Sequence, residues 1–347
     1  MPRTPNNKTV ASSAMRGSSR IGSVLSLMLL LVILAGLIVA AFNRQNIYDW
    51  YRLQGYKAQP AIAALATQDS MTAYARKIFY VNNPQIDSPS VFNTNCPNNG
   101  GEQTIVLGCY HSDQRGIYLL SVNDPVLNGV EQVTAAHETL HAAYDRLSNA
   151  ERNQVDAWLM AYYQNGLTDP RIKSTIDAYR KTEPTQLVNE MHSIFGTEVG
   201  NLPPQLEHYY TRYFSDRTKI VAYADNYQSA FTTRQTAAAT YQSQLAALKT
   251  QIDSLNAALP DKLTAINSSR SQLNQYQASN NIAAYNAAVP GYNSLVNDYN
   301  GSVTQLKSLI AQYNVIVNKY NAIVLEEDYL NSELTSTTPS VTNPQQH

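Results

Sequence analysis

Two histidines four residues apart, with a glutamate directly after the first, are the residues of this chain best suited to chemistry. They form the segment His137-Glu138-Thr139-Leu140-His141. Residues four apart share one face of a helix, so both imidazoles can reach a single Zn²⁺ at about 2 Å. Glu138 can take a proton from a water held at that metal. The spacing therefore predicts metal-assisted hydrolysis, and the plainer interpretation is a helix face with two ordinary histidines.

The motif and the residues after it, His141-Ala142-Ala143-Tyr144-Asp145, resemble the active-site helix of the zincin metallopeptidases, and that of thermolysin-like enzymes in particular. The resemblance covers roughly residues 100–215. It implies a peptidase that uses a zinc-activated water against a polypeptide substrate, with His137 and His141 as zinc ligands and Glu138 as general base. It also implies that the motif helix packs under a small sheet whose edge strand holds the substrate backbone.

A catalytic zinc site needs a third protein ligand and an open position. In the gluzincins this ligand is a Glu on a later helix, and the segment Asn189-Glu190-Met191-His192 is similar to that element. We expect Glu190 to be the ligand, because a carboxylate among apolar neighbours is costly unless it meets a cation. His192 is the alternative, and the two side chains point about 200° apart on a helix. Glu198 and Asp145 are weaker candidates.

The chain departs from the thermolysin pattern in two ways. The stretch between the motif and Glu190 is longer, and Ile194 stands where an Asp usually supports the ligand helix. The partner that orients the ligand histidine is therefore unassigned. Four residues of one later helix are candidates for stabilising the oxyanion, with simple packing as the plainer interpretation: His208, Tyr209, Tyr210 and Tyr213.

The elements around the motif are predicted from local patterns. Residues 104–110 and 116–122 are β-branched runs that predict a β-hairpin. Thr134 is expected to cap the motif helix, Ser148 with Glu151 forms a capping box, and Thr185 is expected to cap the helix of Glu190. We therefore predict a mainly α fold with a small sheet, in which residues 43–215 form a zincin-like α+β domain.

The only two cysteines are Cys96 and Cys109. Outside the cytoplasm such a pair is normally oxidised, so we expect a disulfide. The alternative is two inert buried thiols.

Residues 21–42 carry no charge and would rise about 33 Å as a helix, which is enough to cross a bilayer. Basic residues are denser before this run than after it, which favours a cytoplasmic tail at residues 1–20 and extracytoplasmic main domains. We expect a single-pass membrane anchor. The alternative is a cleaved signal peptide and a secreted protein.

Residues 216–334 are predicted to form a long antiparallel helical coiled-coil hairpin that turns near residues 279–281. Its second arm repeats Tyr every seven residues from Tyr285 to Tyr320, with Leu306 in the fourth place, and a parallel series runs from Val289 through Ile310 to Val324. In the first arm Pro260 is expected to interrupt the seam, the row of regularly spaced apolar residues that faces the second arm. Residues 335–347 are rich in Ser, Thr, Pro and Gln and are expected to be disordered.

Charge excludes one class of partner. The net charge of -1 gives no basic excess for binding nucleic acid. The predicted function is a membrane-anchored zinc peptidase with extracytoplasmic polypeptide substrates, and the coiled coil offers a surface for a protein partner. The alternative function is a cell-envelope spacer or scaffold whose zincin-like domain is structural or inactive.

Overall fold

The computed structural model describes residues 1–3, 18–97 and 107–335. The chain forms two compact units, Met1–Ala58 and Gln59–His347. The predicted tails at residues 1–20 and 335–347 fall mostly outside the described residues. The predicted boundaries at residues 43 and 216 stay predictions.

The first unit contains two helices, α1 (Ser18–Phe42) and α2 (Arg44–Leu53). Within α1 the segment Val24–Phe42 is long and apolar enough to cross a membrane, a test that a signal sequence near an N-terminus also passes. The predicted apolar helix is therefore confirmed. The choice between an anchor and a signal sequence stays a prediction, as does the topology.

The second unit contains one three-stranded sheet in the order β1-β3-β2, made of β1 (Gln85–Asp87), β2 (Gly108–His111) and β3 (Gly116–Leu120). β2 and β3 run antiparallel, with Cys109 opposite Tyr118, so the predicted β-hairpin is confirmed. Residues 104–106 of its predicted first strand lie outside the described residues. β1 pairs in parallel with β3 and was not among the strands predicted from the sequence. Among the described strands, β2 lies at an edge of the sheet.

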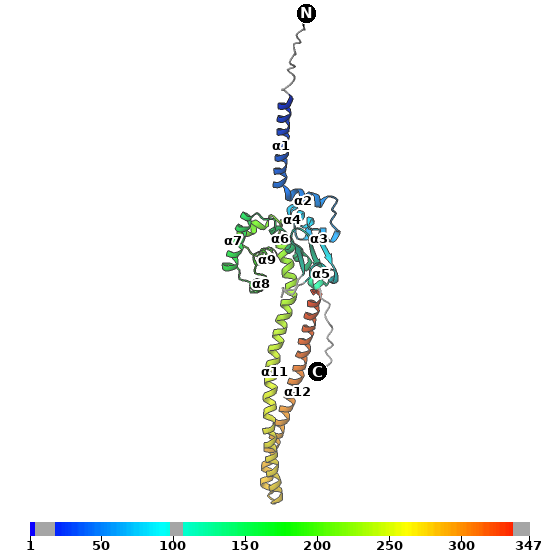
Figure 1. The fold of residues 1–347 in the computed structure, drawn as a ribbon. Helices are drawn as coiled ribbons and strands as arrows, with labels where there is room; N and C mark the ends of the chain where they lie inside the picture. The colour runs from blue at the N-terminus through cyan, green and yellow to red at the C-terminus, as the bar shows by residue number, and fades with distance from the viewer. Residues whose placement is uncertain (4–17, 98–106, 336–347) are drawn as a thin grey trace. The chain divides into compact units, whose positions relative to one another are not determined.

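Helices make up most of the second unit: α3 (Pro60–Gln68), α4 (Ala73–Val81), α5 (Pro89–Asn95), the 3₁₀ turn η1 (Pro125–Leu127), α6 (Val130–Tyr144), α7 (Asn149–Asn165), α8 (Pro170–Thr182), α9 (Leu187–Glu198), α10 (Pro204–Tyr210), α11 (Thr218–Ala278) and α12 (Ile282–Glu333) (Figure 1). α6, which carries the His-Glu motif, packs against α9, α4, α3, α11 and the strands β2 and β3. It can be surrounded in this way because Ala135, Ala136, Ala142 and Ala143 are small and fully buried. The mainly helical fold with a small sheet is as predicted.

Two of the three expected helix caps are wrong. α6 begins four residues before Thr134, and the Thr134 hydroxyl donates to the carbonyl of Val130 inside the helix. The N-cap of α9 is Gln186 and not Thr185. The capping box of Ser148 and Glu151 at the start of α7 is confirmed. A threonine hydroxyl can accept a hydrogen bond from a backbone N–H at a helix start, or donate one to a carbonyl one turn earlier inside a helix. The sequence alone therefore does not separate a cap from a helix interior.

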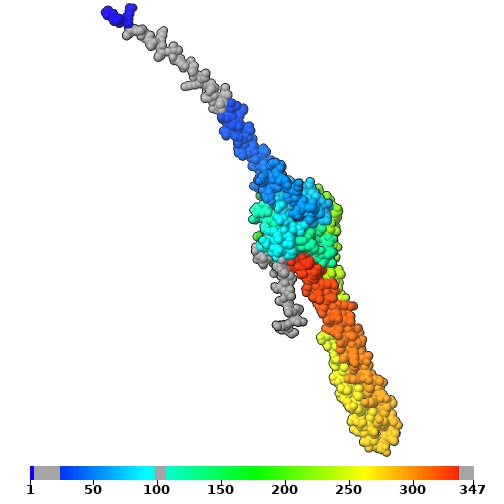
Figure 2. All heavy atoms as spheres, turned by 90° about the vertical axis from the view of Figure 1, so that its right-hand side faces the viewer, coloured from blue at the N-terminus to red at the C-terminus, as the bar shows by residue number. Residues whose placement is uncertain are grey.

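α11 and α12 lie side by side and run antiparallel (Figures 1 and 2). The side-chain pairs that join them are Arg234 with Glu326, Gln242 with Tyr320, and Lys262 with Asp298. In an antiparallel pair of constant register, the numbers of facing residues have a constant sum. Here that sum is about 560 for all three pairs, so the register does not change along the helices. The turn falls at Ser279–Asn281, as predicted.

One position of the expected hairpin is wrong, and Pro260 does not break its helix. Pro260, the residue expected to interrupt the seam, lies inside a continuous α11. It is exposed, so the backbone carbonyl of Asn256 that loses its hydrogen bond faces water. In α12 Ile310 is exposed, and the buried residue at that level is Leu309.

Candidate metal centre

α6 presents the two histidines of the motif on one face. The ring centroids of His137 and His141 lie 4.8 Å apart with the planes at 71°. Both side chains are largely buried, with 17% and 10% exposed. The spacing of four residues along the helix thus brings two imidazoles together, as the sequence predicts.

α9 brings the third group of the site. It packs directly on α6 because Gly196 has no side chain: a Cβ there would collide with Leu140 of α6 and with Tyr210. The far end of α9 is held by Arg217, which donates to the carbonyls of Phe195, Val199 and Gly200. These carbonyls would otherwise lack partners at the helix end. The helix that carries Glu190 is therefore fixed at a close distance from the motif.

The carboxylate of Glu190 faces both imidazoles. Its Oε2 lies 3.6 Å from Nε2 of His137, and its Oε1 lies 3.5 Å from Nε2 of His141. The ligand-type atoms of the three residues all lie within 4.8 Å of one another. This is the convergence of two nitrogens and one oxygen that we predicted for a metal ion.

Asn189 orients one of the imidazoles. Nδ1 of His141 lies 3.0 Å from Oδ1 of Asn189, so the imidazole donates a hydrogen bond through Nδ1 and keeps the lone pair of Nε2 for a ligand. The amide of Asn189 is held in turn by Gln186. The partner that sequence reasoning left unassigned is thus the residue next to Glu190. Nothing in a single sequence distinguishes this Asn from a surface residue.

The pKa of Glu190 is lowered although its carboxyl is buried. Burial acts to raise the pKa of its carboxyl, but His141, His137 and a hydrogen bond from Tyr179 outweigh burial, so the pKa lies below its ordinary value. Its Oε2 has no hydrogen-bond partner among the described residues, since 3.6 Å to His137 is too long for one. A cation would compensate a buried carboxylate oxygen that has no hydrogen-bond partner.

Glu138 lies beside the cluster, next to Gly108 at the start of β2. It is buried, and Gly108 of β2 passes so close that a Cβ there would lie 2.9 Å from Oε1 of Glu138. Gly108 therefore allows the edge strand to approach the motif helix at the position of the expected general base. Sequence reasoning did not single out Gly108.

A cleft of about 1010 Å³ contains the cluster. Its sides are β2, α6, α8 and α9, and the bases of α11 and α12 contribute Tyr227, Phe231 and Leu334. Glu138, both histidines and Glu190 line this cleft together with Tyr179. The predicted site residues therefore share one surface that is open to a ligand.

His192 lies outside the cluster. It is fully buried, and its Nε2 lies 2.9 Å from the hydroxyl of Tyr209. The rings of Tyr144, Tyr209 and Tyr210 surround it with centroids 5.2–5.7 Å away. Burial lowers the pKa of His192 to about 3, so it is a neutral core residue. The expected divergence of positions 190 and 192 on one helix accounts for this placement.

The weaker candidates are also placed. Glu198 forms an ion pair with Arg171 at 2.6 Å, and Asp145 hydrogen-bonds Tyr110; both line the cleft but lie outside the cluster. The expected oxyanion donors do not line the cleft: His208 is exposed on α10, and the three tyrosines pack near His192. Tyr179, which the sequence did not single out, is the tyrosine that contacts Glu190.

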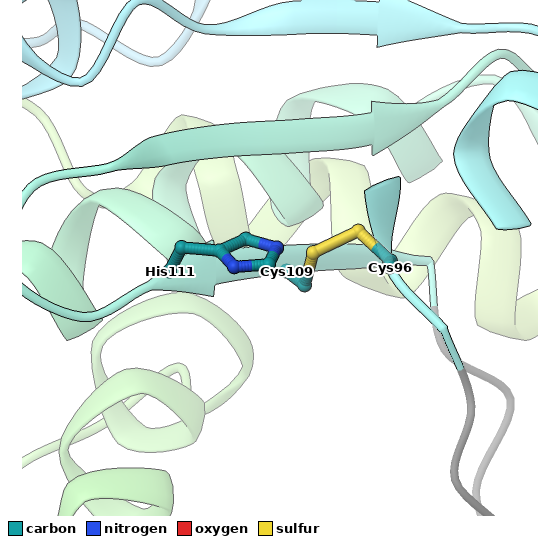
Figure 3. A group of neighbouring side chains, drawn as sticks. All are labelled: Cys96, Cys109 and His111. Carbon is teal, nitrogen blue, oxygen red and sulfur yellow. A yellow bond between two sulfur atoms is a disulfide. The ribbon is translucent and has the colours of Figure 1, made fainter. Parts of the chain in front are cut away.

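Cys96 and Cys109 lie at disulfide distance, with Cα atoms 6.0 Å apart (Figure 3). The pair joins the end of α5 to β2, and Nε2 of His111 lies 2.7 Å from the carbonyl of Asn95 beside it. His111 and the two sulfur atoms also lie close enough together for a metal. Sulfur atoms bonded to each other offer no thiolate, so this group is not a ligand set.

Comparison of the chain with models of protein families, with curated proteins and with solved structures finds no match in any of the three.

Proposed function

We propose that this chain is a membrane-anchored, zincin-like zinc peptidase that hydrolyses extracytoplasmic polypeptides. The observation that carries the proposal is the convergence of His137, His141 and Glu190 beside Glu138 in one cleft. A helix with two ordinary histidines does not require a buried carboxylate from another helix at 3.5 Å from one imidazole and 3.6 Å from the other.

The residues fit Zn²⁺. Two imidazole nitrogens and one carboxylate oxygen are a ligand set that catalytic zinc accepts. Oε2 of Glu190, which has no hydrogen-bond partner among the described residues, supports a cation in this place. The hydrogen bond from His141 to Asn189 selects the tautomer that a metal needs. When bound, Zn²⁺ supplies a Lewis acid that polarises a peptide carbonyl and makes water acidic.

Glu138 is assigned the role of general base. It follows the first histidine and lines the cleft, so its carboxylate can accept the proton of the attacking water and pass it to the leaving amine. Its buried position beside β2 keeps this carboxylate in a defined place.

A polypeptide in extended form is the substrate class that suits the cleft. β2 is an edge strand, and residues 107–112 line the cleft. An edge strand offers unpaired N–H and C=O groups to an extended chain. Tyr179 is the one residue that we assign to the stabilisation of developing charge, in place of His208 and the three tyrosines near His192.

The location is proposed from two observations. Val24–Phe42 suits a membrane anchor, and the joined cysteines suit an oxidising compartment outside the cytoplasm. Secretion after cleavage of a signal peptide accounts for the same observations, with a soluble product.

The long helical pair favours a second function, that of an envelope spacer. Every tyrosine of the seven-residue series in α12 is partly buried, which supports a coiled coil with α11. A spacer does not need the ligand cluster, so the two functions are separable by experiment.

The test is hydrolysis of a fluorogenic peptide library by the purified full chain, with Glu138→Gln as the matched control. Gln keeps the shape of the side chain but cannot accept a proton, so this variant should bind zinc as the wild type does and lose activity by at least about 100-fold. A wild-type chain that binds zinc stoichiometrically and hydrolyses no peptide would favour the spacer. Activity that survives in Glu138→Gln would remove Glu138 from its role.

A further inference from the structure

α2 exposes its aromatic face and buries its carboxylate. Ile47, Trp50 and Tyr51 share one face by their spacing, and 48%, 65% and 72% of each is exposed. On the opposite side the amide of Gln45 donates to Asp49 at 2.8 Å, and only 2% of Asp49 is exposed. A helix on the surface of a water-soluble protein has the reverse arrangement. The exposed face therefore suits an environment other than bulk water.

The position of α2 identifies that environment. One residue, Asn43, separates it from α1, and its dihedral angles of −105° and 13° depart from helical values. The chain turns there, and Figure 1 shows α2 lying across the end of α1 instead of continuing it. When α1 crosses a bilayer, a helix that lies across its end follows the bilayer surface.

The residue types of α2 fit lipid headgroups. Trp and Tyr rings combine an apolar body with a polar group and concentrate at the membrane–water boundary. Arg44 and Arg52 lie at the two ends of the helix, where anionic headgroups attract them. With ten residues α2 is about 15 Å long, which is too short to span a bilayer and suits a helix in the interface plane.

We infer that α2 is a second membrane contact, whose face of Ile47, Trp50 and Tyr51 lies in the headgroup region beside the α1 span. The inference rests on the membrane anchor of the proposed function and is independent of the peptidase. It means that the chain leaves the bilayer along the membrane surface and not straight out of it.

The test uses the two tryptophans of the chain, Trp50 and Trp158. The full chain is reconstituted into vesicles of phosphatidylcholine and phosphatidylglycerol that contain lipid brominated either near the headgroup or near the end of the acyl chain. Trp158→Phe leaves Trp50 as the reporter, and Trp50→Phe leaves Trp158 of α7 as the reference. We expect bromine near the headgroup to quench Trp50 several-fold more than it quenches Trp158, and more than deep bromine quenches Trp50.

A control on the opposite face tests the orientation of α2. Gln45→Trp, in a chain with Trp50→Phe and Trp158→Phe, places the indole closer to α1 in sequence but about 140° around the helix from position 50. This variant should be quenched less than Trp50.

Two results would overturn the inference. Quenching of Trp50 no stronger than that of Trp158 or of Gln45→Trp, in a chain that floats with the vesicles, would leave the anchor intact and assign the aromatic face to a protein partner or a second copy. A chain that does not float with the vesicles would remove the anchor as well, while peptide hydrolysis by the same preparation would still report on the peptidase.

Discussion

Glu190 and Asp69 are both buried carboxylates, and their surroundings give them opposite states. Glu190 faces two imidazoles, and the pKa of its carboxyl is lowered although burial acts to raise it. Asp69 is fully buried at the end of α3, and neither carboxylate oxygen has a hydrogen-bond partner among the described residues. Burial raises its pKa well above the ordinary value. Glu190 is therefore suited to hold a cation, whereas burial favours the protonated form of Asp69.

Asp69 should make the stability of the chain depend on pH. Because the folded pKa is raised, the folded state holds one proton more than the unfolded state at pH values between the ordinary pKa of Asp, about 4, and the folded pKa. The free energy of unfolding then falls as pH rises through that window. Asp69→Asn removes the ionisation, so the variant should gain stability relative to the wild type as pH rises from 4 to 7.

Thermal unfolding of both chains at several pH values measures this difference. A difference between Asp69→Asn and wild type that stays constant from pH 4 to pH 7 would show that Asp69 ionises as freely in the folded chain as in the unfolded one.

At the residue scale, sequence reasoning predicts the groups whose position follows from helix geometry or from the energetic cost of burial. The two histidines follow from a spacing of four, and Glu190 follows from the cost of an uncompensated carboxylate among apolar neighbours. Asn189, Tyr179 and Gly108 act through contacts between different elements of the fold. No local pattern marks such contacts, so these residues are visible only in the structure.

At the scale of elements, the site depends on how closely α9 approaches α6. Gly196 lies where the two helices touch, and a Cβ there would meet Leu140 and Tyr210. A displacement of α9 away from α6 would move Glu190 away from both histidines. We therefore expect the metal affinity of the proposed site to depend on packing about six residues along α9 from Glu190.

Gly196→Ala should destabilise the chain by about 1–3 kcal/mol, as overpacking of a core does. It should also lower zinc affinity by about tenfold, because the ligand helix is displaced. Gly200→Ala is the matched control: its Cβ would lie 3.8 Å from Val221, an ordinary contact, and both quantities should stay at the wild-type values. Thermal unfolding and competition with a zinc chelator measure the two effects. Wild-type zinc affinity in Gly196→Ala would mean that the site tolerates a shift of α9.

Local patterns account for the elements with strong signals and fail for the others. The hairpin of β2 and β3 and the capping box of α7 have signals within a few residues. β1 is three residues long and is stabilised by its pairing with β3, which is distant in sequence. Pro260 stays within a helix because α11 packs along α12 on both sides of it, a contact that helix propensity does not include.

At the scale of the whole molecule, the cleft is assembled from segments separated by more than two hundred residues of chain. Residues of β2, α6, α8 and α9 line it, and the bases of α11 and α12 complete it. The sequence predicts a hairpin that follows the peptidase domain but not that its base contributes Tyr227, Phe231 and Leu334 to the cleft. Such an arrangement depends on tertiary packing alone.

The outer part of the helical hairpin should be dispensable for catalysis. Thr250 and Ile310 lie opposite each other in the register of the side-chain pairs, so a short turn can replace residues 251–309. All cleft-lining residues of α11 and α12 remain in this variant. We expect zinc content and hydrolysis of short peptides to stay at wild-type values. Loss of hydrolysis in a chain that keeps its zinc and its fold by circular dichroism would show that the outer hairpin takes part in the reaction.

The central claim is that His137, His141 and Glu190 together hold zinc, and zinc affinity in two matched variants tests it most directly. Glu190→Gln removes the charge of the proposed ligand and keeps its size, whereas His192→Gln retains an amide near the hydroxyl of Tyr209. Chelator competition on the purified full chain should show affinity at least about tenfold lower for Glu190→Gln and wild-type affinity for His192→Gln. The opposite order, or equal affinity in all three chains, would contradict the site.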